Sequence, residues 1–277
     1  MTQPTELLPG IRVFSSRRYF SLSTTVVGHD GTALVIDPNW DADEIESIPV
    51  DLDNLGVHCA LGLSTHVHYD HVLWHERLGM VPRYSSRWTV RALDERRDEI
   101  LAPLVGDVPT ELINLAGRLT PLDGGRDPHL VPSPASPQPV TALPEPYAVP
   151  WSGRPVVVHE HDAHAPAHLA VEVLDQRVLI CADMCSDVEL PMPDEANPNL
   201  IAYLAGLDRL AEVARRCDLL IPGHGTPTTD PMSRIDADRR YLDAICRTGR
   251  SDDPRIALPD MADLHASNLA RARATEV

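Results

Sequence analysis

The sequence contains no lysine, because all 24 of its basic residues are arginine. Lysine forms Schiff bases, binds phosphate in P-loops and activates serine in Ser-Lys pairs, so these three kinds of chemistry are excluded. Aromatic residues are also scarce, at 4% of the 277 residues. A hydrophobic core must therefore be built mainly from valine, leucine, isoleucine and alanine.

Long apolar runs are absent as well. No stretch approaches the roughly 20 apolar residues that a membrane helix needs, and the N-terminal residues lack a basic region followed by an apolar stretch. The five cysteines are an odd, scattered set without C-x-x-C spacing, which is typical of reduced thiols. We therefore expect a cytoplasmic protein that has no membrane partner.

Acidic residues outnumber basic residues by 41 to 24, which gives a formal net charge of −17. A chain this acidic repels phosphate backbones and anionic lipids unless its charges are strongly segregated. We therefore expect a small-molecule substrate and no nucleic-acid partner. The hydrophobic share of 43% is ordinary for a globular protein, and the length allows one large domain or two small ones.

Short apolar runs and turn residues predict the order of the elements along the chain. The expected strands span residues 11–14, 22–27, 32–37, 59–63, 155–159, 168–174, 177–182 and 218–222. The expected helices span residues 70–78 and 86–101, with two more beginning at Asn197-Pro198 and Asp230-Pro231, where a capping side chain precedes proline. This order predicts two similar halves that pack sheet on sheet, with helices outside.

Two segments stand apart from this pattern. Residues 121–150 contain nine prolines among polar residues, which favours a loop or lid over a domain boundary. Residues 251–277 are amphipathic, within a helical extension expected around 231–277. That amphipathic stretch could cover the sandwich or form a homodimer contact, and the sequence leaves both options open.

The strongest chemical signal is the run Thr-His-Val-His-Tyr-Asp-His at residues 65–71, directly after an expected strand. Backbone alternation would place His66 and His68 on one side, where they can converge on one ion. Asp70 and His71, in the following turn, can reach a neighbouring ion. The alternative is a solvated, histidine-rich turn without a ligand.

Three further candidates each lie at the end of an expected strand: His164, Asp183 and His224. Strand ends at one edge of a sheet are where a rigid scaffold presents functional side chains. Considered alone, Asp183 would be an ordinary strand-end carboxylate and His224 an ordinary turn histidine. Together with the first cluster they supply five imidazoles and two carboxylates, enough for two divalent ions if one carboxylate bridges.

These residues, in this order, resemble the metallo-β-lactamase superfamily in its binuclear hydrolase branch. The resemblance runs from about residue 10 to residue 225 and includes the Pro-Gly-His-Gly turn around His224. It implies an α/β fold, an αββα sandwich of two mixed β-sheets flanked by helices, with a metal site in a cleft at one edge of both sheets. We accordingly expect residues 1–277 to form a single domain of this kind.

The resemblance also implies a ligand set. The first metal would be held by His66, His68 and His164, the second by Asp70, His71 and His224, and Asp183 would bridge them. Imidazole and carboxylate without thiolate suit zinc, here two ions per chain, and less decisively iron or manganese.

One segment departs from the pattern of the family. Its usual T-P-G-H-T-P-G-H is here His-Asp-Ala-His-Ala-Pro-Ala-His at residues 161–168, which lacks both glycines. The local turn is therefore uncertain, and His161 competes with His164 as a ligand. For His168, a hydrogen-bonded neighbour of the site or a sheet histidine is expected rather than a ligand.

Two zinc ions that share a water lower its pKa and yield a hydroxide without a side-chain base. In the resembling hydrolases this metal-bridging hydroxide attacks a carbonyl, and Asp70 would orient it. A bridging Asp183 resembles lactonase and thioesterase members, so the expected substrate is a small ester, lactone or thioester. β-Lactam hydrolysis, a mononuclear iron dioxygenase and a non-catalytic binding protein are the alternatives, although the complete second ligand set opposes the last two.

Overall fold

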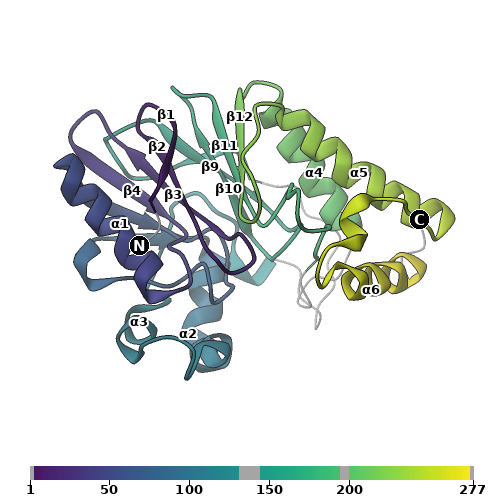
Figure 1. Cartoon of the computed structure of the whole chain (residues 1–277), viewed down its shortest axis with the longest axis horizontal. Coiled ribbons are helices and arrows are strands. Elements are labelled where there is room, and N and C mark those ends of the chain that lie inside the picture. The colour runs from purple at the N-terminus through teal and green to yellow at the C-terminus, as the bar shows by residue number, and fades with distance from the viewer. Residues whose placement is uncertain (1–2, 131–143, 194–199, 275–277) are drawn as a thin grey trace.

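The computed structural model describes residues 3–130, 144–193 and 200–274, in which two mixed β-sheets are packed together (Figure 1). The first sheet has the strand order β1-β2-β3-β4-β5-β6-β7, antiparallel up to β4 and parallel from there on. Its strands are β1 (Thr5–Leu8), β2 (Ile11–Ser15), β3 (Leu22–Val27), β4 (Thr32–Ile36), β5 (His58–Leu63), β6 (Arg83–Ser85) and β7 (Thr120–Pro121).

The second sheet has the order β12-β11-β10-β9-β8, and only its β11–β12 pair is parallel. Its strands are β8 (Tyr147–Ala148), β9 (Val156–His161), β10 (His168–Val173), β11 (Val178–Ala182) and β12 (Leu219–Pro222). Because β4 runs parallel to β5 and β11 runs parallel to β12, each sheet presents neighbouring carboxyl ends at one edge. Those ends carry the candidate site.

Helices cover the outer faces of both sheets (Figure 1). The helices of the first half are α1 (Ala42–Leu55), α2 (Arg87–Leu101) and α3 (Thr110–Leu115), and those of the second half are α4 (Leu200–Ala214), α5 (Pro231–Thr248) and α6 (Met261–Ala274). Short 3₁₀ turns lie at Glu76–Leu78, Ala102–Leu104, Pro128–Leu130 and Pro254–Ala257. Within the described ranges, no helix combines the length and apolar character needed to cross a membrane.

The core lies between the sheets because alternate strand residues point inward. Ile36 of β4 packs in the same fully buried cluster as Leu169 and Val171 of β10. Burial of each such side chain contributes about 1.5–3 kcal/mol relative to exposure. The opposite face of the second sheet packs on α4, where Cys181 lies in one cluster with Leu207. Cys181 is therefore a packing residue, as expected for a reduced thiol.

The expected sandwich is confirmed, and most expected strands and helices are found within a few residues of their bounds. Ser86 caps α2 by accepting a hydrogen bond from the amide of Thr89, and Asp230 caps α5 in the same way through Ser233. Helix α1 is not among the expected helices, and it holds Pro49 in its interior, where proline is unusual. The expected Asn197-Pro198 start of α4 lies outside the described residues.

The expected helix over residues 70–78 is wrong. Only Glu76–Leu78 forms a 3₁₀ turn; residues 70–72 form a turn and a bend, and residues 73–75 have no regular structure. Val72, Leu73 and Trp74 are all buried, so three consecutive side chains point into the protein. A helix would instead place one of every three or four residues on its buried face.

The described ends of the proline-rich segment are not irregular throughout, since they hold part of β7, the turn at Pro128–Leu130 and β8. Residues 131–143, the middle of the expected lid, lie outside the described part of the chain. At the C-terminus, α6 packs on α5 and buries Met261 and Ala272 in the cluster that α4 shares. The amphipathic stretch thus covers the outer helices of its own chain.

Candidate metal centre

All seven predicted ligands meet at the shared edge of the two sheets. His66 and His68 follow β5, Asp183 follows β11, and His224 follows β12. The structure places the candidate atoms in two groups, each compact enough to surround one ion. They are His66, His68, His164 and Asp183 in the first group, and Asp70, His71 and His224 in the second.

The first group is centred on three imidazoles. Nδ1 of His68 lies 3.0 Å from Nε2 of His66 and 3.0 Å from Nε2 of His164. The Oδ2 atom of Asp183 lies 3.6 Å from Nε2 of His66 and 3.4 Å from Nε2 of His164. Three nitrogens and one oxygen therefore converge, a donor set that suits a tetrahedral divalent ion such as zinc.

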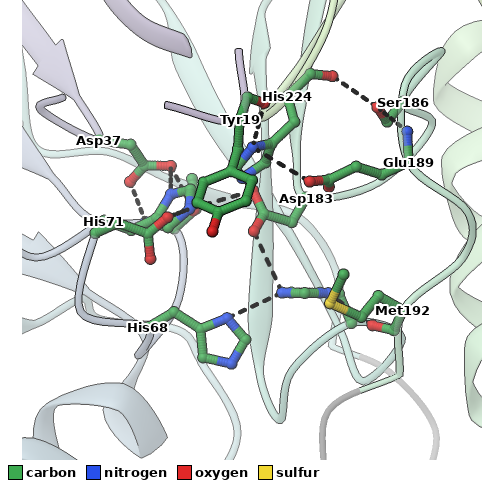
Figure 2. Close-up of polar contacts among 12 residues, drawn as sticks. Tyr19, Asp37, His68, His71, Asp183, Ser186, Glu189, Met192 and His224 are labelled. Carbon is green, nitrogen blue, oxygen red and sulfur yellow. Dashed lines mark hydrogen bonds and ion pairs between the residues drawn. The ribbon is translucent and has the colours of Figure 1, made fainter. Parts of the chain in front are cut away.

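The second group faces the other oxygen of the same carboxylate. Oδ1 of Asp183 lies 3.2 Å from Nε2 of His71 and 3.4 Å from Nε2 of His224. Nε2 of His71 also lies 3.4 Å from Oδ2 of Asp70. Figure 2 shows the Asp183 carboxylate pointing into the middle of the cluster. Asp183 therefore presents one oxygen to each group, which is the arrangement that a bridging ligand needs.

The outer nitrogens of the histidines are held by acceptors that fix the ring orientation. Nδ1 of His164 donates to the carbonyl of Met192 at 2.7 Å. Nδ1 of His224 donates to the carbonyl of Tyr19 at 3.0 Å (Figure 2). Because a carbonyl can only accept, Nδ1 carries the proton in both rings. In the neutral tautomer, the inner Nε2 atoms then offer lone pairs to the cluster.

Asp37 supports the first half of the site from beneath. Its carboxylate accepts hydrogen bonds from the amide and the hydroxyl of Thr65, at 2.8 and 2.6 Å. The Thr65 oxygen in turn lies 3.0 Å from Nδ1 of His66. Oδ2 of Asp37 is also 3.0 Å from Nδ1 of His71, without the alignment of a hydrogen bond. Asp37 thus supports His66 through Thr65 and lies against His71 of the second group.

Unpaired polar atoms among the described residues indicate that the donor set is suited to metal ions. Oδ1 of Asp183 and Nε2 of His71 are buried without a hydrogen-bond partner there. An unpaired buried carboxylate oxygen that faces inward lone pairs is costly unless a cation lies among them or the rings are protonated. The cluster is therefore built either for cations or for imidazolium ions.

The charges of the site shift the pKa values of its histidines in both directions. Burial and the neighbouring His71 lower the pKa of His66 well below its usual range. For His224, burial lowers the pKa, but the Asp183 carboxylate outweighs it and raises the pKa to about 10. For His71, burial is likewise outweighed by Asp183, Asp70 and Asp37, which raise its pKa well above normal. Without metal, the second group therefore takes up protons.

The structure also places the two histidines that the sequence left open. Nδ1 of His161 accepts from the amide of Ala163 at 3.3 Å, and neither His161 nor His168 belongs to the two groups. The His168 ring lies 4.8 Å from the His66 ring, centroid to centroid. Both nitrogens of His168 lack a hydrogen-bond partner within the described residues, so the expected hydrogen bond is not found. His168 is a packing neighbour of the cluster.

Backbone geometry under the site is unusual at the strand ends. Asp37 and Ala182 have φ values of 47° and 45°, in the left-handed region that favours glycine. Such strain clusters at functional sites. Gly223 is needed for close approach, because a Cβ there would lie 2.1 Å from Oδ1 of Asp183. The glycine before His224 therefore makes room for the Asp183 carboxylate.

The sequence analysis did not predict the residues that contact the candidate histidine ligands and orient their rings. Asp37 could have been found as a polar residue at the end of an expected strand. Tyr19 and Met192 act through backbone carbonyls, which leave no side-chain signal. Glu189 was also missed; its Oε1 lies 3.6 Å from Nδ1 of His224, and burial raises its pKa to about 7.

Comparison with known proteins identifies the family of the chain. A sequence model of the metallo-beta-lactamase superfamily matches residues 18–237. A search of curated proteins found no sequence match to the chain.

Solved structures share the fold at low sequence identity. A metallo-beta-lactamase from Pontibacter korlensis has a TM-score of 0.57 and 15% identity, covering 86% of this chain and 98% of its own. A beta-lactamase domain protein from Burkholderia ambifaria has a TM-score of 0.61 and 20% identity, covering 88% and 74%. A double mutant of the sec-alkyl sulfatase PisA1 has a TM-score of 0.60 and 15% identity, covering 89% and 42%.

Proposed function

Because the chain belongs to the metallo-beta-lactamase superfamily, it is a metal-dependent hydrolase, and we propose that it binds two zinc ions and hydrolyses a small ester, lactone or thioester. The observation that carries the binuclear part is the position of Asp183, whose two oxygens face different groups of ligands. His66, His68 and His164 would hold one ion with Asp183. Asp70, His71 and His224 would hold the other.

Two bound divalent ions polarise a substrate carbonyl and lower the pKa of water towards neutrality, so no side-chain nucleophile is required. Asp70 then has a second role. In the metal-free protein, burial raises the pKa of Asp70, but the neighbouring His71 outweighs this effect and lowers it. With metal bound, His71 would be neutral, and the cation would keep the Asp70 carboxylate ionised instead. An ionised Asp70 can accept a hydrogen bond from the attacking water and orient it toward the substrate.

The carbonyl substrate is proposed from the same carboxylate. A bridging Asp183 resembles the lactonase and thioesterase members of the superfamily, which favours esters, lactones and thioesters over β-lactams. The net charge of −17 opposes nucleic-acid substrates. A mononuclear iron dioxygenase would leave the second group without a purpose, yet Asp70, His71 and His224 are all in place.

We also place the protein in the cytoplasm. All five cysteines are free thiols, and Cys59, Cys181, Cys185 and Cys217 are buried. Persistent free thiols are typical of a reducing compartment.

The first test is metal content and activity together. Protein purified without added metal is expected to hold about two zinc ions per chain by elemental analysis. His66→Ala should abolish hydrolysis across a panel of esters, lactones and thioesters while the chain stays folded, because the sheets supply most of the core. The matched control is His29→Ala, which removes an exposed histidine outside the cluster.

Two outcomes would contradict the proposal. About one iron ion per chain with oxygen consumption would indicate the dioxygenase. Full activity in purified His66→Ala would exclude the metal centre as the catalytic site.

A further inference from the structure

The turn that carries His164 has strained backbone. It spans residues 162–167 between β9 and β10, and Ala167 has a φ of 52°, where glycine would be at ease. The family segment that this turn resembles has glycine at that position. Such backbone persists only where its surroundings hold it in place.

Asp162 closes this turn from one end to the other. Its Oδ1 accepts a hydrogen bond from the amide of Ala167 at 2.9 Å, so the carboxylate spans the residues on both sides of His164. A buried carboxylate needs a charged partner, and here the partner comes from elsewhere in the chain.

That partner is Arg126. Its Nη1 and Nη2 donate to Oδ2 and Oδ1 of Asp162 at 2.7 and 2.6 Å, and its Nε donates to Glu160. The side chains of Arg126 and Asp162 are only 7% and 2% exposed, so solvent screens this pair little. A planar guanidinium that donates two parallel hydrogen bonds to a carboxylate fixes both the position and the orientation of that carboxylate.

The segment before Arg126 is shaped for this contact. A Cβ on Gly125 would lie 2.9 Å from Oε2 of Glu160, and a Cβ on Gly124 would lie 2.7 Å from Cβ of Tyr147. The Tyr147 hydroxyl donates to Glu160 at 2.9 Å. The two glycines thus let the chain lie directly against β8 and β9, with Arg126 beneath the turn.

We propose that Arg126 is a positioning residue for His164, acting through Asp162 and the strained turn. The first metal group therefore depends on a residue of the proline-rich segment that contacts no ligand itself. This inference rests on the proposed function, because it assumes that His164 holds an ion.

Arg126→Lys is the direct test, since lysine keeps the charge but loses the two-pronged grip. The affinities for both zinc ions would be measured by competition with a chromophoric chelator. The coordination geometry would be followed in the cobalt-substituted protein by its visible absorption spectrum. We expect affinity for one ion to fall about 10–100-fold, the usual effect of removing an outer partner of a ligand, while the other ion binds as before. The cobalt spectrum should change with it.

Arg12→Lys is the matched control. Arg12 grips Asp51 through Nε and Nη2, both at 2.7 Å, with both side chains mostly buried, and it contacts none of the candidate ligands. It should lower thermal stability while leaving both zinc affinities unchanged. If Arg126→Lys does not fold, Asp162→Asn should give the same selective loss, because it removes the charge that Arg126 grips.

A second background separates positioning from a general loss of stability. Ala167→Gly relieves the strain that Arg126 is inferred to restrain, so Arg126→Lys should cost less affinity in the Ala167→Gly protein than in the wild type. An equal cost in both backgrounds would overturn the role of the strained turn. Wild-type affinities in Arg126→Lys would refute the inference alone, whereas a wild-type protein that binds fewer than two ions would refute the binuclear function as well.

Discussion

Metal binding to the second group should release protons, because His71 and His224 are protonated when no metal is bound. His224 faces Oδ1 of Asp183 at 3.4 Å. At this distance, with an effective dielectric constant of about 20, two unit charges attract by about 5 kcal/mol. Burial is the strongest single influence on His224 and lowers its pKa. The attraction to Asp183, together with Glu189 and Asp70, more than offsets burial and raises the pKa from 6.5 to about 10. His71 is raised in the same direction.

At pH 7 both rings are therefore protonated in the metal-free protein, and each must lose its Nε2 proton to bind an ion. When the second group is filled, we expect release of one proton from His224 and a further contribution from His71, so the apparent affinity should rise at least about tenfold per pH unit between about pH 6.5 and 8. His66 has a lowered pKa and should contribute no proton.

The assay is calorimetric zinc titration in two buffers with different enthalpies of protonation, which gives the proton count directly. His224→Gln should remove one proton from that count. An apparent affinity that does not change with pH, or a release well below one proton at pH 7, would refute the reasoning about Asp183 and the charged rings.

Three other perturbations have defined outcomes. Ala167→Gly should raise the free energy of unfolding by up to about 1 kcal/mol, measured by urea denaturation, because it removes a left-handed alanine; a loss of stability would contradict the strain. Gly223→Ala should greatly lower metal content and activity, since its Cβ would collide with the Asp183 carboxylate and with the backbone of Ala182 and Asp183; normal metal content would argue against the close approach. In the metal-free protein, a histidine with a raised pKa stabilises the fold below about pH 6.5 and loses that effect as the pH rises through about 10. His224 should therefore lower the free energy of unfolding by up to about 5 kcal/mol between these limits. Thermal melts that show no change with pH would contradict this expectation.

The sequence predicts the sandwich and the composition of the ligand clusters because both depend on local patterns. Alternating valines and leucines give the strands, and the spacing of His66, His68, Asp70 and His71 after a strand brings them to one edge. Asp183 and His224 could be placed only by order along the chain and by the family resemblance. Their convergence depends on how β11 and β12 pair, which periodicity does not encode.

Other features depend on tertiary contacts and leave little trace in the sequence. The run from Asp70 to Leu78 reads as a helix, but burial of Val72, Leu73 and Trp74 together overrides that propensity. The left-handed Ala167 could not be expected from an alanine. Its partner Asp162 is held by Arg126, which lies 36 residues away in the chain.

Each group of candidate ligands draws on both halves of the molecule. His66 and His68 follow a strand of the first sheet and His71 belongs to the same turn, whereas His164, Asp183 and His224 extend from the second sheet. Bound ions would therefore cross-link the two sheets, and separating the halves would require releasing both ions. An ion that binds the packed sheets more tightly than the separated halves stabilises their packing, by an amount that grows with its free concentration relative to its Kd. Chelation should thus loosen the contact between the two sheets, beginning at the edge that carries the candidate ligands.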